Sequence, residues 1–224
     1  GIDYRSTGFQ VTTQGQNNDR LTNLLSGTRA ISWPDSNSAY AYLSFFFRGE
    51  YNYKELYYAE VAARTDASSR FGKDHRWGMF WSLGFMWNIK NEAFLKEIEW
   101  LTNAQIKLST GTSGNSEIPY YDHLALVAGD ANYNDEAGIY PKQSGNEELS
   151  WEQTCANNIG LTLGFFNRVN LNVDFYHKKT TNMLMLVPQS YAITGVGNRW
   201  DNIGAMMNRG AEIAMTGDVI RPKY

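Results

Sequence analysis

The fold is decided by Arg76-Trp-Gly-Met-Phe-Trp-Ser-Leu-Gly-Phe-Met-Trp-Asn88. Successive side chains of a β-strand point to opposite faces, so residues two apart share a face. A helix would mix the two sets, so the stretch predicts a strand. Three tryptophans on one face are easier to place against lipid than in a small soluble core. One face is apolar throughout, holding Trp77, Met79, Trp81, Leu83, Phe85 and Trp87; the other holds Arg76, Gly78, Ser82, Gly84 and Asn88, with Phe80 and Met86 as exceptions.

The same alternation recurs along the chain and predicts about eight strands. A weaker form runs through residues 2–13, and clear forms occupy residues 43–51, 57–66, 103–109, 158–165, 169–178 and 211–216. Unpaired charges have a large desolvation cost in a dry core, so the charged face of these strands must meet water. A soluble sandwich also turns its polar face to water, and alternation alone does not separate it from a membrane barrel. The polar face carries Arg48, Glu50, Glu60, Arg64, Lys107, Asp174 and Glu212.

The lengths of the connections favour the barrel. Short connections alternate strictly with longer polar ones, which is typical of outer-membrane barrels with short periplasmic turns and long external loops. The short ones are residues 52–55, 90–100 and 167–168; the longer ones are 14–38, 67–75, 111–148 and 181–205. With the short turns placed in the periplasm, six aromatic residues fall at one height, as in a periplasmic girdle: Tyr51, Tyr53, Tyr57, Trp87, Trp100 and Phe165. Trp77 and Trp151 fall near the opposite rim.

Composition limits the other classes. The net charge of -3 does not favour nucleic acid as a partner, and the aromatic content of 14% is high for a soluble domain. Mean hydropathy is -0.47, and no apolar run reaches the roughly 18 residues of a membrane helix. A barrel strand needs only about 10 residues and shows every second one to lipid. The single Cys155 excludes an internal disulfide framework. No signal peptide is visible at Gly1, so we expect a removed leader or an excerpt of a longer chain.

A family resemblance covers residues 40–216. The phrases that carry it are Glu50-Tyr-Asn-Tyr-Lys54, Arg64-Thr-Asp-Ala-Ser-Ser-Arg-Phe-Gly-Lys-Asp74, Arg76-Trp-Gly78, Trp87-Asn-Ile89, Gly111-Thr-Ser-Gly-Asn115, Asn146-Glu-Glu-Leu-Ser-Trp-Glu-Gln-Thr154, Asp174-Phe-Tyr-His-Lys-Lys-Thr-Thr181, Asn202-Ile-Gly204 and Asn208-Arg-Gly210. In order and spacing the sequence resembles the SusC/RagA-like TonB-dependent receptors of Bacteroidota.

The resemblance implies an all-β fold, an antiparallel transmembrane β-barrel segment that supplies about eight strands of a plugged barrel of about 22. We assign residues 1–224 to the barrel domain and expect the plug domain and the remaining strands outside this chain. The implied activity is active import of a large nutrient, an oligosaccharide or a peptide, through the outer membrane of a Gram-negative bacterium. The implied partners are TonB, reached through a missing N-terminal part, and a SusD-like surface lipoprotein. Neither a cofactor nor covalent chemistry is implied.

The residues themselves show no catalytic set. His75, His123 and His177 lie on separate segments without the spacing of metal ligands. Cys155 falls on the predicted lipid face, where a small apolar filler is the simpler interpretation. Nucleophile-elbow and phosphate-loop motifs are both absent from the sequence, so we expect no enzyme. In the stretch Ser69-Arg-Phe-Gly72 we expect a tight hairpin in which Gly72 adopts a positive φ.

The candidate substrate contacts are aromatic residues of the long loops and their polar neighbours, because sugars and peptides stack on exposed rings. The alternative is that these rings pack loop against loop and cap the barrel. The candidate contacts are Tyr120, Tyr121, Asp122, Tyr133, Tyr191, Asn198 and Trp200, with Tyr140 as a further ring.

Three other classes stay open at this point. The first is a complete eight-stranded outer-membrane barrel with a structural or adhesion role, which needs its first and last strands to pair. Arg221-Pro-Lys-Tyr224 would be a poor edge for that pairing. The second is an outer-membrane enzyme, and the third is a secreted carbohydrate-binding sandwich.

Overall fold

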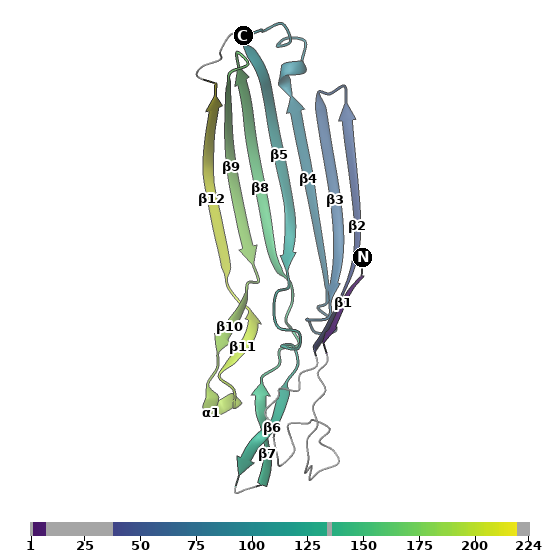
Figure 1. The fold of residues 1–224 in the computed structure, drawn as a ribbon, viewed down its shortest axis with the longest axis vertical. Coiled ribbons are helices and arrows are strands. Elements are labelled where there is room, and N and C mark those ends of the chain that lie inside the picture. Colours follow the sequence, from purple (N-terminus) through teal and green to yellow (C-terminus); the bar gives the residue numbers. More distant parts are fainter. Residues whose placement is uncertain (1, 8–37, 134–135, 219–224) are drawn as a thin grey trace.

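The computed structural model describes residues 2–7, 38–133 and 136–218, and the statements below concern these residues. An antiparallel sheet of eight strands, in the order β1-β2-β3-β4-β5-β8-β9-β12, forms most of the structure (Figure 1). This confirms the predicted all-β class and strand number. Of residues 2–13, only 2–7 are described, and they form a strand. The strands are β1 (Ile2–Thr7), β2 (Ser38–Tyr53), β3 (Tyr57–Ser68), β4 (Trp77–Asn88), β5 (Leu101–Asn115), β8 (Glu152–Phe165), β9 (Val169–Thr181) and β12 (Ala205–Gly217).

The short connections lie together at one end of the sheet, as predicted (Figure 1). Between β2 and β3, Lys54 and Glu55 have φ of 53° and 58°, and between β8 and β9, Phe166 and Asn167 both have φ of 53°. Two successive positive φ values give the turn that matches the twist of paired strands. The third connection holds the 3₁₀-helix η2 (Ile89–Asn91).

The long connections lie at the other end, and two of them contain hairpins of their own (Figure 1). One hairpin pairs β6 (Leu126–Tyr133) with β7 (Glu136–Gln143). The other pairs β10 (Leu184–Pro188) with β11 (Asn198–Asn202) through the short helix α1 (Tyr191–Thr194). The sequence did not predict these four strands. Of residues 14–38, only Ser38 is described.

The strand register places all the predicted apolar sets on one face, called here the apolar face. One cross-strand row on it consists of Tyr51, Ala59, Phe85, Leu108, Ile159, Phe175 and Ala211. The next row points to the opposite, polar face and consists of Glu50, Glu60, Gly84, Ser109, Asn158, Tyr176 and Gly210. Period-two patterns found separately in seven strands therefore agree once the strands are paired.

The two faces differ in what covers them. Met79 and Ile213 on the apolar face are 69% and 73% exposed, and large exposed side chains recur along that face. So wide an apolar surface is expected to meet lipid or a partner rather than water. The polar face instead holds ion pairs between strands. Arg48 lies 2.5 Å from Glu50 and 3.0 Å from Glu60, which offsets the repulsion of two glutamates placed directly opposite each other.

The predicted aromatic girdle is present beside the short turns. The ring of Tyr57 stacks on that of Trp87 at 6.2 Å, and the ring of Trp100 stacks on that of Phe165 at 6.0 Å. The Tyr57 hydroxyl and the Trp87 Nε1 both donate to Glu92 Oε1, which ties the β4–β5 connection to this end of the sheet.

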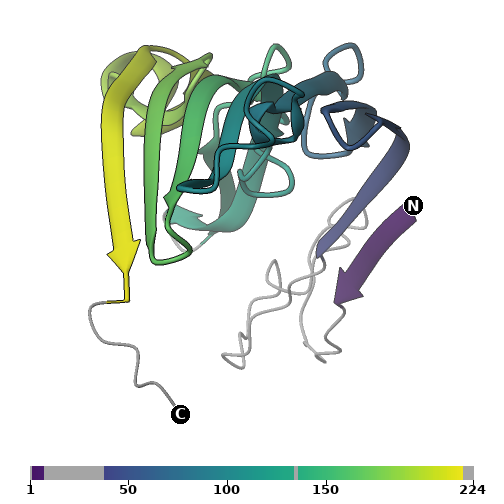
Figure 2. The ribbon, with the colours of Figure 1, turned by 90° about the horizontal axis from the view of Figure 1, so that it is seen from above.

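The sheet is an open arc. Seen from above (Figure 2), it curves so that β12 and β1 form the two arms. Within the described residues these two strands are the edges and do not pair with each other, as a closed eight-stranded barrel would require. Among the described residues, no helix has the length and apolar composition needed to cross a membrane.

Candidate binding region at the loop end of the sheet

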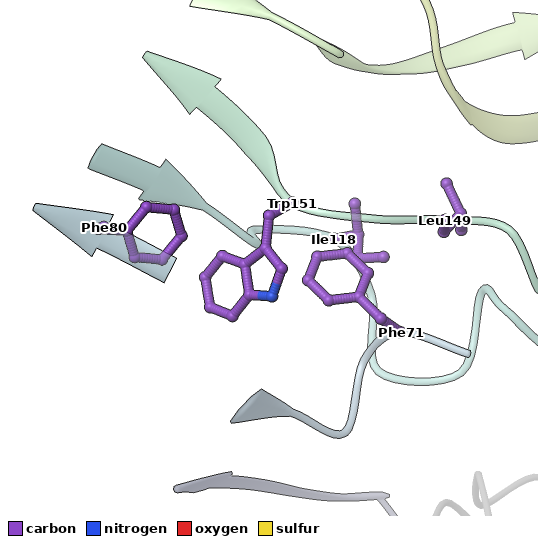
Figure 3. Close-up of a cluster of buried hydrophobic side chains, with 5 residues drawn as sticks. All are labelled: Phe71, Phe80, Ile118, Leu149 and Trp151. Atoms are coloured by element: carbon purple, nitrogen blue, oxygen red, sulfur yellow. The ribbon is translucent and has the colours of Figure 1, made fainter. Parts of the chain in front are cut away.

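A buried cluster joins the loops to the polar face. It consists of Phe71, Phe80, Ile118, Leu149 and Trp151 (Figure 3). Only Phe80 comes from a strand within the sheet, and the others come from the loops or, for Trp151, from the residue just before β8. The Trp151 ring lies 5.4 Å from both Phe71 and Phe80, and its Nε1 donates to the carbonyl of Arg76 at 2.8 Å. The exception at Phe80 is thus explained, because this ring faces loops rather than water.

Two glycines allow the loops to approach this closely. A Cβ on Gly72 would lie 2.0 Å from the carbonyl oxygen of Glu147, and a Cβ on Gly114 would lie 2.1 Å from the Phe80 ring. Among the described glycines, the positive φ values belong to Gly195 and Gly204. The expected positive φ at Gly72 is therefore wrong. The residue is small because the backbone of another loop packs against it.

Tyr120 belongs to a group of three tyrosines around Arg70. The guanidinium carbon lies 5.0 Å from the ring centroid of Tyr120, 5.3 Å from that of Tyr40 and 5.7 Å from that of Tyr42. Tyr120 also stacks on Tyr40 at 5.0 Å. Arg70 donates to the carbonyl of Ser116 at 3.2 Å, so the charge and the rings together hold this loop against β2.

Tyr121 and Asp122 lie next to this group. The Tyr121 hydroxyl accepts a hydrogen bond from the backbone N–H of Ala39 at 2.7 Å, and its carbonyl accepts one from Gln143 Nε2 at 2.8 Å. Burial raises the pKa of the Asp122 carboxyl, and the charge of neighbouring His123 opposes that shift. His123 is buried, and burial lowers the pKa of its imidazole. His123 is thus set away from water at the base of the loop, and Asp122 is half-buried beside it.

Trp200 reaches the same region from the β10–β11 hairpin. Its side chain packs against the buried cluster, and its carbonyl accepts a hydrogen bond from Asn146 Nδ2 at 3.1 Å. The amide of Asn202 also joins the hairpin to β8, since it accepts from the N–H of Ser150 at 2.8 Å and donates to the Ser150 carbonyl at 2.9 Å.

The remaining predicted contacts lie apart. Tyr191 in α1 is 68% exposed, and Asn198 at the start of β11 is also exposed. Tyr140 lies in β7, and Tyr133 ends β6, where its side chain is outside the described part of the structure. The structure thus gathers Tyr120, Tyr121, Asp122 and Trp200 around the base of the loops and leaves the others on the hairpins. That the set contacts substrate stays a prediction.

Sequence reasoning missed a hollow on the polar face beside the buried cluster. Its volume is about 410 Å³, and its lining includes Tyr42, Arg64, Asp66, Phe80, Ser82 and Trp151. Arg64 Nε lies 2.7 Å from both carboxylate oxygens of buried Asp66. Aromatic surfaces beside a fixed ion pair suit a ligand with both apolar and polar groups. The local signal was Phe80, one of two apolar exceptions on the polar face of its strand.

The functional side chains form no metal site in the part of the chain described, where no group of three or more His, Cys, Asp or Glu residues is placed to hold an ion. Cys155 lies on the apolar face opposite Thr112 and Lys179, as predicted.

Known proteins resemble this chain over most of its length. It is 35% identical to TonB-dependent receptor P39 of Formosa agariphila over 185 residues, 82% of this chain and 18% of that protein. It is 34% identical to TonB-dependent receptor SusC of Bacteroides thetaiotaomicron over 193 residues, 81% of this chain and 19% of that protein. A solved structure of the RagAB peptide transporter superposes with a TM-score of 0.78 at 38% identity, covering 92% of this chain and 23% of that one.

The chain spans about a fifth of the length of these receptors. The model of the family described as TonB dependent receptor-like, beta-barrel matches residues 1–221. A match over nearly the whole sheet, together with relatives above 30% identity, shows that the chain belongs to the TonB-dependent receptor-like β-barrel family.

Proposed function

We propose that the protein containing this chain imports a large nutrient, an oligosaccharide or a peptide, across the outer membrane of a Gram-negative bacterium. The observation that carries the proposal is the division of the sheet into an exposed apolar face and a charged face with loops docked at one end. Such a sheet fits a barrel wall with lipid outside and an aqueous path inside. The similarity to the RagAB peptide transporter supports the peptide class, and the similarity to SusC supports a TonB-dependent receptor.

In this proposal residues 1–224 belong to the barrel domain, and the plug and the other strands lie elsewhere in the receptor. Energy enters through TonB and the missing N-terminal part. Substrate is bound and passed on without covalent change, so the protein acts as a transporter and not as an enzyme. TonB-dependent receptors are transporters, which agrees with this assignment.

The proposed substrate path begins at the loops and continues into the hollow near Phe80 and Trp151. There rings offer stacking surfaces and Arg64 and Asp66 offer hydrogen bonds. Exposed residues such as Tyr191 and Asn198 meet substrate first, while the docked residues shape the entrance. The proposed contacts are Tyr120, Tyr121, Asp122, Tyr133, Tyr191, Asn198 and Trp200.

The two hairpins provide the surface for a SusD-like lipoprotein. Each has large apolar side chains in the open, with Val127 at 69% and Ile139 at 64% exposed on one and Ile193 at 84% exposed on the other. They extend from the loop end of the sheet, where a lid protein would approach (Figure 1). Apolar tips of this kind favour a partner that covers them.

The test measures uptake by cells that carry the full-length receptor. Labelled oligosaccharides and peptides are supplied to wild type, to a strain without the receptor and to a strain without TonB. We expect one substrate class to accumulate in a manner that needs both proteins. Replacing the ion pair with R64Q/D66N should lower that uptake about tenfold at equal receptor abundance, since a charge pair that lines the hollow and its hydrogen bonds are removed from the path. Uptake of both classes that does not change when the receptor is removed would refute the proposal.

A further inference from the structure

The apolar face carries basic side chains at one place. The outward positions of a strand are those whose side chains lie on the apolar face. At the described outward positions of β2–β5, β8, β9 and β12, the basic side chains are His177 and Lys179 of β9 and Arg209 of β12, and all others are apolar or uncharged. The acidic side chains of these seven strands all point to the polar face. Three basic residues therefore stand together on a surface without a single acidic residue.

The register brings these residues into contact range of one another. His177 lies directly opposite Arg209, and Lys179 is the next outward residue of β9 and a diagonal neighbour of Arg209. All three are exposed, and none has an ion pair or a side-chain hydrogen bond with another described residue. The two cations Lys179 and Arg209, on neighbouring strands, repel each other unless an anion lies between them. The described part of the chain provides none on this face.

The place of the three residues on the sheet points to the source of the anion. The outward row of Leu108, Ile159, Phe175 and Ala211 is wholly apolar, and the next outward row toward the loops is Thr110, Asn157, His177 and Arg209. The wholly apolar rows of these four strands thus end at the basic residues. Lysine and arginine on the lipid face are costly at the middle of a bilayer but nearly neutral at its interface. The basic group therefore lies where acyl chains give way to headgroups, on the side of the long loops.

We propose that Lys179 and Arg209, with His177 and Asn157 beside them, bind the phosphate of an outer-leaflet lipid whose headgroup is a phosphorylated sugar. Arginine and lysine are the side chains best suited to phosphate oxygens. Phe175, Ile159 and Ile213 are each more than half exposed on the short-turn side of this group, and they give the acyl chains of the same molecule an apolar surface. A free phosphate ion would use the cations but not this surface. The proposal rests on the outer-membrane location proposed above.

The test uses the full-length receptor, extracted in mild detergent and examined by native mass spectrometry for bound phosphorylated glycolipid. We expect the wild type to retain the lipid and the double variant K179Q/R209Q to retain at least tenfold less. The conservative variant K179R/R209K keeps both charges and should retain it. The matched control K107Q/K178Q removes two charges from the polar face of β5 and β9 and should behave as wild type. A shift of the folded band on unheated gels checks that each variant is folded.

A second experiment identifies the source of the phosphate. The receptor is placed in bilayer discs that contain the glycolipid before or after treatment with a phosphatase, and inorganic phosphate is tested as a competitor. Loss of binding after phosphatase treatment, with little competition by inorganic phosphate, supports the proposal. Equal retention by K179Q/R209Q and the control, equal binding of the dephosphorylated lipid, or displacement by millimolar inorganic phosphate would each overturn it. A receptor that retains the lipid but imports nothing would instead refute the proposed transport and leave this site in place.

Discussion

The two faces of the sheet are built from alternate residues of the same strands, yet they differ in how strictly apolar and polar residues alternate. This alternation is called here the period-two rule. On the apolar face the rule holds across seven strands from the row of Phe85 to the short turns, and large side chains remain in the open. On the polar face it fails at Phe80, which contacts docked loops. A face that meets one uniform environment keeps a uniform pattern, whereas a face that meets other parts of the protein acquires exceptions. The exception at Phe80 therefore marks a contact, and that contact lies in the binding region.

The largest expected effect comes from breaking the contact on the polar face. Phe71 is fully buried in the cluster, so Phe71→Ala should weaken the docking of the loops by about 3–5 kcal/mol. We expect rapid protease cleavage within residues 116–151 of the full-length receptor, with the barrel itself intact. Phe94 lies in the β4–β5 connection and is 66% exposed, so Phe94→Ala is the control and should leave cleavage unchanged. Equal cleavage of the two variants would contradict the role given to the cluster.

The second effect tests the apolar face directly. Leu83 and Ser82 are neighbours in β4 with side chains on opposite faces. Leu83→Arg should cost about 2–4 kcal/mol if it lies near the middle of the bilayer, whereas Ser82→Arg faces the aqueous side. The amount of heat-modifiable receptor in the outer membrane should fall sharply for the first and little for the second. The assignment of the faces fails if Ser82→Arg is the more damaging change.

A smaller effect on stability is expected from the β6–β7 hairpin. Replacing residues 127–139 with a short Gly-Ser linker leaves Tyr121 and Gln143 in place, and these hold the base of the loop. Loop length has a weak effect on stability, about 0.6 kcal/mol for each doubling, so receptor abundance should hardly change. Uptake, or copurification of the lipoprotein, should fall because exposed Val127 and Ile139 are lost. A collapse in abundance would show instead that the hairpin supports the barrel.

The smallest effect is a pH dependence at the loop base. Burial lowers the pKa of His123, so the folded loop favours the neutral imidazole. The folded loop therefore has its full stability above the pKa of the unfolded chain, near 6.5, and loses stability as the pH falls below that value. Asp122 has the opposite sign, since its raised pKa favours the folded loop at low pH. We expect Asp122→Asn to slow protease cleavage of the loop at pH 7.5 and His123→Gln to remove the acceleration seen at pH 5.5. Cleavage of His123→Gln that still accelerates at pH 5.5 would assign the effect to another group.

The strands, their faces and the side of the long loops could be predicted from sequence because each depends on local alternation or on connection length. The packing of the loops could not. The hydrogen bond from Ala39 to the Tyr121 hydroxyl joins residues 82 apart, and the bond from Trp151 to Arg76 joins residues 75 apart. No local pattern encodes such contacts. For the same reason Gly72 was assigned to a turn, although its smallness serves a contact with Glu147. The hairpin strands β10 and β11 were missed because each has only five residues.

The tight turns have a consequence for the order of assembly. Closing a chain between strands costs little conformational entropy when three residues separate them, as between β2 and β3 or β8 and β9, and more when a long loop intervenes, as between β5 and β8. We expect these two hairpins to form first and to pair with the other strands as preformed units, with the loops docking last. Hydrogen-exchange labelling at successive times during refolding of the receptor would show protection of β2, β3, β8 and β9 before that of the residues around Trp151. The end of the sheet without the binding region would then be the end at which its folding begins.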